Sequence, residues 1–426
     1  MVPRLLWGNS IATVQVHGRI EVGILRHTRA CSRRHLLALT AIMLILRIVS
    51  SLVGLVVLCS VLLDALETVV LPRRVRGRFR LSAWYYRLTW GSWAALVNRI
   101  QSQGRREALL AYFGPLSLVL LLALWASGLI FGFALVQHGT GAHLQSSDGD
   151  ASFGRLLYHS GETFFTLGYG DIVPISAWTR FLAVLEAGMG FAFLGIVIGY
   201  LPTIYSAFSR REIEISLLDA RAGSPPTAAE LLRRYGACSR GDGLDRIFHA
   251  WERWSAEVLE SHLSYPVLSF FRSQHNNQSW LAALTTVLDA TALVLVGVDG
   301  IPGEQARITF AIARHAVVDL SQVVLTRYNP HTDDRLPASE LVRLRAVLAD
   351  KGLKLREGAA ADEKLRALRA MYEPYVDALA RSLLIALPCW LAEDRQVDNW
   401  QVAPWDEAIA ARNVATVSSY SSEDHF

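Results

Sequence analysis

Three long apolar runs dominate the pattern of hydrophobic and polar positions along this chain. They cover residues 36–63, 109–136 and 181–209. Each run exceeds the roughly 20 residues that a helix needs to cross the hydrocarbon core of a bilayer. The middle run carries no charge, whereas the other two contain one charged residue each, Arg47 and Glu186. The pattern predicts three membrane-spanning helices in the first half of the chain.

The second half shows the shorter periodicity of amphipathic helices. Apolar residues recur at spacings of three and four, first at Ile247, Trp251, Trp254 and Val258, and later at Leu365, Leu368, Tyr372, Tyr375 and Leu379. Patterns typical of β-strands are scarce. We therefore predict an all-α protein, in which membrane helices are followed by an α-helical soluble domain after a Gly/Pro break at residues 222–227.

Two further apolar stretches admit more than one interpretation. Residues 279–298 are long enough to span a membrane, but Asp289 and three threonines favour a buried helix of a soluble domain. Residues 375–391 are interrupted by two charged residues and a proline, so a core segment is again favoured. The interrupting residues are Asp377, Arg381 and Pro388.

Composition and charge agree with a membrane protein that carries a soluble domain. Hydrophobic residues make up 52% of the chain, which is high for a soluble protein of this length. Residues 1–209 hold 18 Arg and 9 acidic residues (net +9), and residues 210–426 hold 24 Lys and Arg and 29 acidic residues (net −5). The basic residues mostly flank the predicted spans, so we expect no nucleic-acid partner. The four cysteines are widely spaced, which argues against a disulfide framework or a zinc site.

The loops predict the orientation in the membrane. Residues 72–106 contain nine arginines and no acidic residue, so the positive-inside rule places them in the cytoplasm. Residues 137–180 then lie outside, and the chain from Arg210 onward is cytoplasmic, in a protein of the inner (plasma) membrane. The same topology places residues 1–34 outside, against their six arginines. We expect this segment to be an N-terminal extension that is disordered or foreign to the natural chain. The alternative is that the first apolar run is not a simple crossing of the membrane.

Residues 81–100 have the composition of a helix that lies in the membrane interface. Aromatic and leucine residues stand among few charges, namely Trp84, Tyr85, Leu88, Trp93 and Leu96. A fourth, poor membrane span is the alternative interpretation.

A short stretch between the second and third runs, TFFTLGYGDIVP (163–174), breaks the helical pattern. Non-helical backbone at membrane depth is tolerated only where it is buried in protein or lines a watery path. Gly168 and Gly170 alternate with residues that bear side chains, and glycine freely adopts left-handed conformations. Alternating handedness would turn successive carbonyls the same way, where they could replace the hydration shell of a cation. The preceding residues 152–165 are too short to span and are expected to form a pore helix.

This stretch resembles the selectivity filter of the potassium channels, whose sequence is TVGYG. Five residues match, with leucine in place of valine: Thr166, Leu167, Gly168, Tyr169 and Gly170. The resemblance covers residues 109–209, and its neighbours Pro174, Trp178 and Arg180 also agree. It implies a K⁺-coordinating filter, K⁺ as the transported ion without an organic cofactor, and a homotetramer, because each chain supplies one filter strand.

The resemblance also suggests residues that support the filter. In similar channels, carboxyls at the positions of Glu162 and Asp171 pair behind the filter, and a shared proton would raise one pKa. Two independent, solvated acids are the alternative. Trp178 is expected to support the filter as well. Phe164, Phe165 and Tyr169 are expected to form an aromatic cuff, unless they are ordinary packing residues.

The third run matches the inner helix that lines the pore in this family. Gly190 stands where these channels often have a hinge glycine, although close helix packing would also explain it. Pro202 is expected to kink the helix near a cytoplasmic gate. Glu186 must face protein or a water-filled cavity, where it either attracts cations or bonds a neighbouring helix.

These observations predict a potassium-selective channel and its domains. An N-terminal extension (1–34) precedes a first membrane helix with its basic linker (35–108), the pore domain (109–210) and an α-helical cytoplasmic domain (211–426) that controls opening through a ligand of unknown identity. No catalytic residues or metal-ligating cluster emerge, so we expect no enzyme activity. The alternatives are a weakly selective cation channel and a membrane-anchored regulatory or scaffold protein with a silent pore.

Overall fold

The computed structural model describes residues 21–69, 81–146, 152–235, 242–274, 278–324, 326 and 334–392. These residues belong to two compact units. One comprises Met1–Cys59 and Gly128–Phe191, and the other comprises Ser60–Ser127 and Ala192–Phe426. The basic residues 70–80, His275 and the C-terminal tail lie outside the described residues, as do residues 1–20 of the expected extension.

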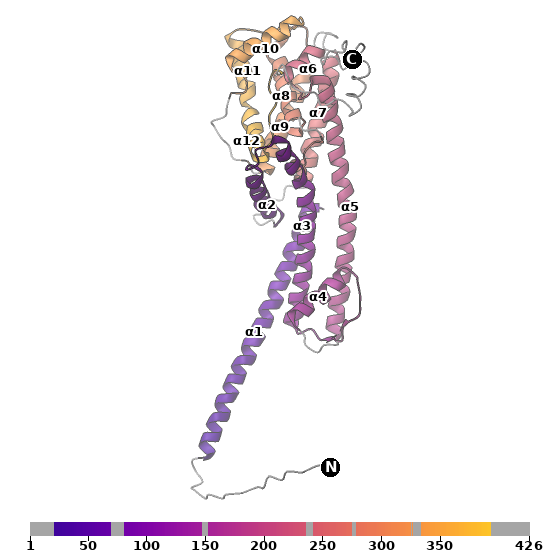
Figure 1. Cartoon of the computed structure of the whole chain (residues 1–426), viewed down its shortest axis with the longest axis vertical. Coiled ribbons are helices and arrows are strands. Elements are labelled where there is room, and N and C mark those ends of the chain that lie inside the picture. The colour runs from indigo at the N-terminus through magenta and orange to yellow at the C-terminus, as the bar shows by residue number, and fades with distance from the viewer. Residues whose placement is uncertain are drawn as a thin grey trace. The chain divides into compact units, whose positions relative to one another are not determined.

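The predicted membrane spans are all long helices (Figure 1). The bounds are Glu21–Val69 for α1, Gln103–Thr140 for α3 and Ala177–Ala222 for α5. These three helices, together with α8 of the second unit, are the described helices long and apolar enough to cross a membrane. The helix α1 begins at Glu21, upstream of the expected domain boundary at residue 35. The boundary at 210 also falls within a helix, because α5 continues to Ala222 without interruption at Pro202.

Glycines bring α1 and α3 into close contact within the first unit. A methyl group added to Gly54 would lie 2.7 Å from the carbonyl oxygen of Gly132, and one added to Gly139 would lie 2.3 Å from that of Arg47. Ser50 donates a hydrogen bond to the carbonyl of Leu135 on α3. Small residues of this kind let helix backbones approach closely in a membrane. The close packing of α1 against α3 therefore depends on these small residues.

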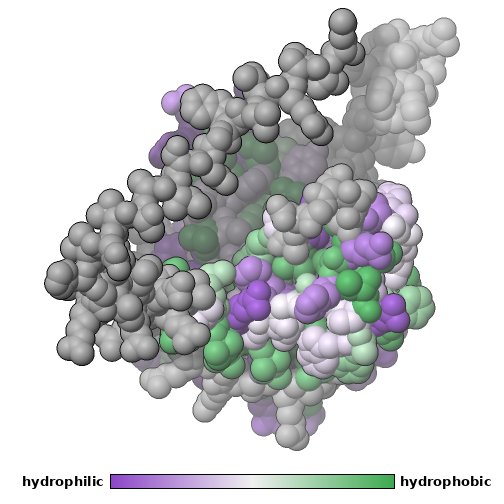
Figure 2. Space-filling view, turned by 90° about the horizontal axis from the view of Figure 1, so that it is seen from below, coloured by the Kyte–Doolittle hydropathy of each residue, from purple (hydrophilic) through white to green (hydrophobic). Residues whose placement is uncertain are grey.

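The described residues between α3 and α5 contain one short helix and two short strands. The helix α4 spans Phe153–Phe164, in agreement with the predicted pore helix. β1 (Leu144–Ser146) pairs antiparallel with β2 (Ile172–Pro174), with Gln145 opposite Val173. This pair joins the chain before the pore helix to the chain after the glycine-rich stretch. In Figure 2, polar and apolar residues are interspersed on the coloured part of the face turned to the viewer.

The second unit contains a helical bundle with one apolar core. Its elements are α6 (Ala228–Tyr235), α7 (Asp242–Ser264), η1 (Pro266–Phe270), α8 (Trp280–Gly297), α9 (Glu304–Val323), α10 (Ala338–Asp350), α11 (Ala359–Ala370) and α12 (Glu373–Leu383). The predicted stripe on α7 is buried at all four positions, as expected. The second stripe was wrong as a single helix, because Met371 and Tyr372 separate α11 from α12.

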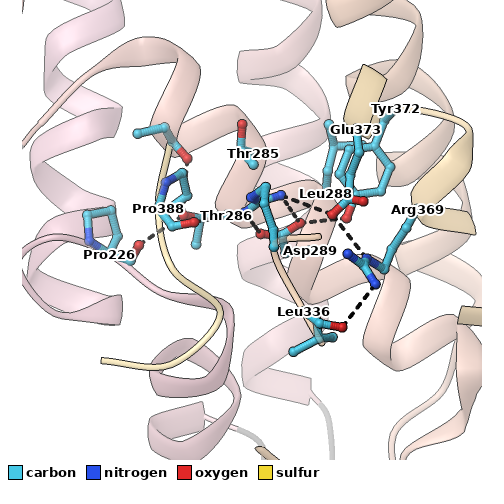
Figure 3. A network of polar contacts seen from close by, with 12 residues as sticks. Pro226, Thr285, Thr286, Leu288, Asp289, Leu336, Arg369, Tyr372, Glu373 and Pro388 are labelled. Carbon is cyan, nitrogen blue, oxygen red and sulfur yellow. Dashed lines mark hydrogen bonds and ion pairs between the residues drawn. The ribbon is translucent and has the colours of Figure 1, made fainter. Parts of the chain in front are cut away.

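The helix α8 is a core helix, as predicted for residues 279–298. It is packed against α9, α11 and α6, and 89% of its residues are buried by protein. Its fully buried Asp289 is satisfied by two partners (Figure 3). Arg335 Nη2 donates to Oδ2 at 2.6 Å, and the Tyr372 hydroxyl donates to Oδ1 at 2.5 Å. Burial, followed by the charge of Asp289, raises the pKa of Tyr372 well above its ordinary value, so the phenol remains a donor.

The last turns of α5 are attached to the bundle through a buried arginine. Arg211 donates to the carbonyls of Leu268 and Phe271 at 2.9 Å each, and to His262 Nε2 at 3.2 Å. Val267 and Leu268 pack with Tyr200 and Ile204 of α5 in a small apolar cluster. The short helix η1 is thereby held against α5 on both sides of Pro202.

His262 is expected to make the free energy of unfolding depend on pH. Its Nδ1 lies 2.8 Å from the carbonyl of Val258, which fixes Nε2 as the acceptor for Arg211. Burial, followed by the charge of Arg211, lowers the pKa of His262 from 6.5 to about 3. Below pH 6.5 His262 is therefore protonated in the unfolded chain but remains neutral in the folded chain. Stability should fall by up to about 1.4 kcal/mol per pH unit as the pH decreases through this window.

Chemical unfolding of the detergent-solubilised protein between about pH 7 and pH 5 measures this slope. The variant His262→Gln keeps an acceptor near Arg211 but does not titrate, so its slope should be shallower than that of the wild type. Equal slopes for both proteins would contradict the assignment.

The helix α2 (Leu81–Val97) belongs to the second unit and has two distinct faces. Trp84, Leu88 and Leu96 are exposed, as expected for a helix in the membrane interface. Tyr85 and Trp93 lie on the other face and are half-buried. Their polar atoms donate to the carbonyls of Ser117 and Leu109 on α3, at 2.9 and 3.2 Å.

Candidate functional site

The backbone of residues 166–170 alternates in handedness, as the two glycines predicted. The φ angle is +55° at Thr166, +63° at Gly168 and +77° at Gly170. Between them, Leu167 and Tyr169 do not have a positive φ. Glycine accommodates such angles freely, but threonine does so at a cost of about 1–3 kcal/mol. Strain of this kind is stored where the surrounding structure requires the conformation. Thr166 is thus part of a constrained turn.

The C-terminal end of the pore helix α4 leads directly into this turn. The amides of Phe165, Thr166 and Leu167 donate to the carbonyls of Gly161, Thr163 and Glu162, at 2.8–3.1 Å. These bonds cap the last turn of α4. The C-terminal end of a helix carries partial negative charge, which favours a cation beyond it. The residues 166–170 therefore begin at the electronegative end of a helix.

Gly190 of α5 is in contact with the end of the pore helix. A methyl group on Gly190 would lie 1.9 Å from the carbonyl oxygen of Phe164 and 2.8 Å from its carbonyl carbon. No side chain fits in this space. The packing interpretation of Gly190 is therefore observed, and its action as a hinge stays a prediction, as does that of Pro202.

Glu186 connects three helices behind the turn. It is fully buried and accepts hydrogen bonds from Gln137 of α3, at 3.0 Å, and from the Ser160 hydroxyl of α4. Ser160 also lies 2.8 Å from the carbonyl of Ile130. Of the two roles considered for Glu186, bonding neighbouring helices is the one that these contacts support. Gln137 and Ser160 were missed from the sequence, although a lone amide at the end of an apolar run was a signal.

The expected supporting residues have other contacts in the single chain. Glu162 is buried, with Oε1 3.4 Å from His159 Nδ1 and Oε2 without a hydrogen-bond partner. Asp171 is exposed, and its pairing with Glu162 stays a prediction. Trp178 is half exposed and stacks on Phe181, with ring centroids 5.6 Å apart.

The three aromatic residues of the expected cuff differ in burial. Phe164 is buried and meets Phe165 edge to face, with ring centroids 5.3 Å apart. Phe165 and Tyr169 are exposed, Tyr169 by 71%. Beside them, a methyl group on Gly168 or Gly170 would meet no atom within 4 Å. The turn is thus open on one side in a single chain.

An ion-conducting pore is built from two long helices, with a pore helix and a turn of alternating backbone between them. In this chain these parts are α3 and α5, with α4 and residues 166–170 between them. Comparison with known families agrees, since residues 119–206 match the family model described as "Ion channel". This segment is therefore similar to the pore domain of that family, in agreement with the resemblance to potassium-channel pores drawn from residues 109–209. The chain is also 21% identical over 244 residues to the "uncharacterized membrane protein YdjJ" of Bacillus subtilis (strain 168), covering 57% of this chain and 70% of the relative. No solved structure matches the chain.

Proposed function

We propose that the protein is a potassium-selective channel in which four copies surround one conduction path. The alternating backbone at Thr166, Gly168 and Gly170 is the observation that carries this proposal. In such a backbone, successive carbonyls turn towards one side, where four copies would provide rings of oxygens for a dehydrated cation. Conduction is passive, without covalent chemistry and without an organic cofactor.

The assembly as a homotetramer is supported by the open side of the turn. Gly168 and Gly170 face empty space in the single chain, and large aromatic side chains beside them are exposed. Since one chain supplies one TLGYG strand, a closed filter requires further copies. In the tetramer, Thr166, Leu167, Gly168, Tyr169 and Gly170 would coordinate K⁺, with Glu162, Asp171 and Trp178 in support.

The helical bundle is proposed to lie in the cytoplasm and to modulate opening. The positive-inside rule places the arginine-rich residues 72–106 on the cytoplasmic side of the plasma membrane. The attachment of η1 to α5 through Arg211 supplies a physical connection from the bundle to the inner helix.

Reversal potentials of the purified full chain in liposomes, under opposed K⁺ and Na⁺ gradients, test this function. We expect a value near the K⁺ equilibrium potential. Gly168→Ala should abolish it, because alanine is unfavourable at φ +63°. The matched control is Gly161→Ala within α4, where the added methyl meets no atom within 4 Å.

Each alternative predicts a different result. A reversal potential near zero would indicate a weakly selective cation channel. The absence of ion flux from folded protein would favour a regulatory or scaffold protein with a silent pore. Unchanged selectivity in Gly168→Ala would contradict the assignment of the filter.

A further inference from the structure

The outward face of α2 is apolar although no part of the chain that the structure describes covers it. Leu81, Trp84, Leu88 and Leu96 follow one another at spacings of three, four and eight, so they share one side of the helix. All four are exposed, Leu88 by 73%. The rest of this side consists of small residues and Arg87, and α2 contains no acidic residue.

Three hydrogen bonds fix which side of α2 faces outward. Tyr85 and Trp93 donate to backbone carbonyls of α3, as described above, and Trp90 Nε1 donates to the carbonyl of Ser382 at the end of α12, at 2.8 Å. Trp90 also meets Phe113 and Phe270 with ring centroids 4.8 and 5.1 Å apart. The inward side is thus packed against α3, η1 and the end of α12, and the apolar outward side is the opposite face of the helix.

The N-terminal end of α2 is attached to two membrane-spanning helices. Both carboxylate oxygens of Asp64, in the last turns of α1, accept from the amide of Ser82 at 3.1 and 3.0 Å. Trp125 of α3 donates to the same carboxylate at 2.9 Å. Because α1 and α3 are both long and apolar enough to cross a membrane, α2 begins beside helices that are suited to a bilayer.

Charge identifies the kind of lipid surface that this face fits. The Arg87 guanidinium carbon lies 5.6 Å from the centroid of the Trp84 ring, so a cation stands beside the apolar stripe. Residues 72–106, which contain α2, hold nine arginines and no acidic residue. Basic segments next to membrane helices are attracted to anionic lipids.

We propose that α2 is a lipid-binding helix, which lays Leu81, Trp84, Leu88 and Leu96 into the interface of an anionic leaflet, with Arg87 at the phosphate groups. Through the bond from Trp90 to Ser382, the same helix anchors the helical bundle to the membrane surface. This proposal depends only on the protein being embedded in a membrane. It is independent of ion selectivity and of the filter.

The test places a nitroxide label at Leu88→Cys in the full-length protein, with Cys31, Cys59, Cys238 and Cys389 replaced by serine. The protein is reconstituted in vesicles of phosphatidylcholine and phosphatidylglycerol. Relaxation by oxygen, which concentrates in lipid, is compared with relaxation by a water-soluble nickel chelate. Arg253→Cys is the matched control, because its side chain is 84% exposed on α7.

We expect the label at position 88 to be relaxed several-fold more by oxygen than by nickel, and the label at position 253 to show the opposite preference. Nickel preference at both positions would overturn the proposal in favour of a solvated face. Protection from both reagents at position 88 would overturn it in favour of a protein cover, such as a second copy.

The role of anionic lipid has its own measurement. In vesicles of phosphatidylcholine alone, the oxygen preference at position 88 should decrease, and Arg87→Gln should reduce this difference between the two lipid compositions. An equal oxygen preference in both compositions would overturn the assignment of Arg87 to anionic head groups.

Discussion

Replacing Gly190 with alanine is expected to abolish the assembly of a conducting pore. The added methyl group would lie 1.9 Å from the carbonyl oxygen of Phe164, and neither atom belongs to a flexible side chain that could move aside. Overpacking of this kind typically costs about 1–3 kcal/mol or more, because the backbones must separate. Since Phe164 lies two residues before the turn at residues 166–170, the separation would displace the filter. Ion flux in liposomes and the oligomer size in detergent measure the effect.

The inner helix provides its own controls for this experiment. A methyl group on Gly188 or Gly195 meets no atom within 4 Å in the single chain. Alanine at these positions should even favour the helix, by about 1 kcal/mol each. Normal assembly with altered opening in Gly190→Ala would contradict the packing role and favour the hinge.

The second large effect is expected at Asp289 in the core of the helical bundle. Asp289→Asn keeps the shape of the side chain but leaves Arg335 buried without its main counter-charge. Breaking a buried ion pair from one side costs about 3–5 kcal/mol. Glu373 lies 3.4 Å from Arg335 and can compensate only in part, because it also pairs with Arg369. Denaturant unfolding of the purified protein, followed by tryptophan fluorescence, measures the loss.

An exposed ion pair gives the comparison for Asp289. Glu363 pairs with Arg366 on α11, where both side chains are about two-thirds exposed. Glu363→Gln should cost at most about 1 kcal/mol, because water screens the pair. If Asp289→Asn cost as little as this control, the network around Asp289 would not contribute to the stability of the bundle.

The sequence alone predicted those features of the structure that depend on neighbouring residues of the chain. The apolar runs predicted α1, α3 and α5 because their lengths match a bilayer, and the short segment before the glycines predicted α4. The alternation of Gly168 and Gly170 predicted the handedness of the turn, since conformational freedom belongs to each residue by itself. The buried stripe on α7 follows from helical periodicity in the same way.

Only the tertiary structure could assign the partners of the buried polar groups. Glu186 is 49 residues from Gln137 in the sequence, Arg211 is 57 from Leu268, and Asp289 is 83 from Tyr372. A buried polar group must be hydrogen-bonded, but its sequence neighbours do not determine which distant group satisfies it. The two faces of α2 were also decided by tertiary structure. Trp90 and Trp93 find carbonyl acceptors on α12 and α3, whereas the chemically identical Trp84 is exposed. Local preference therefore determined the elements, and long-range packing determined which of their side chains meet.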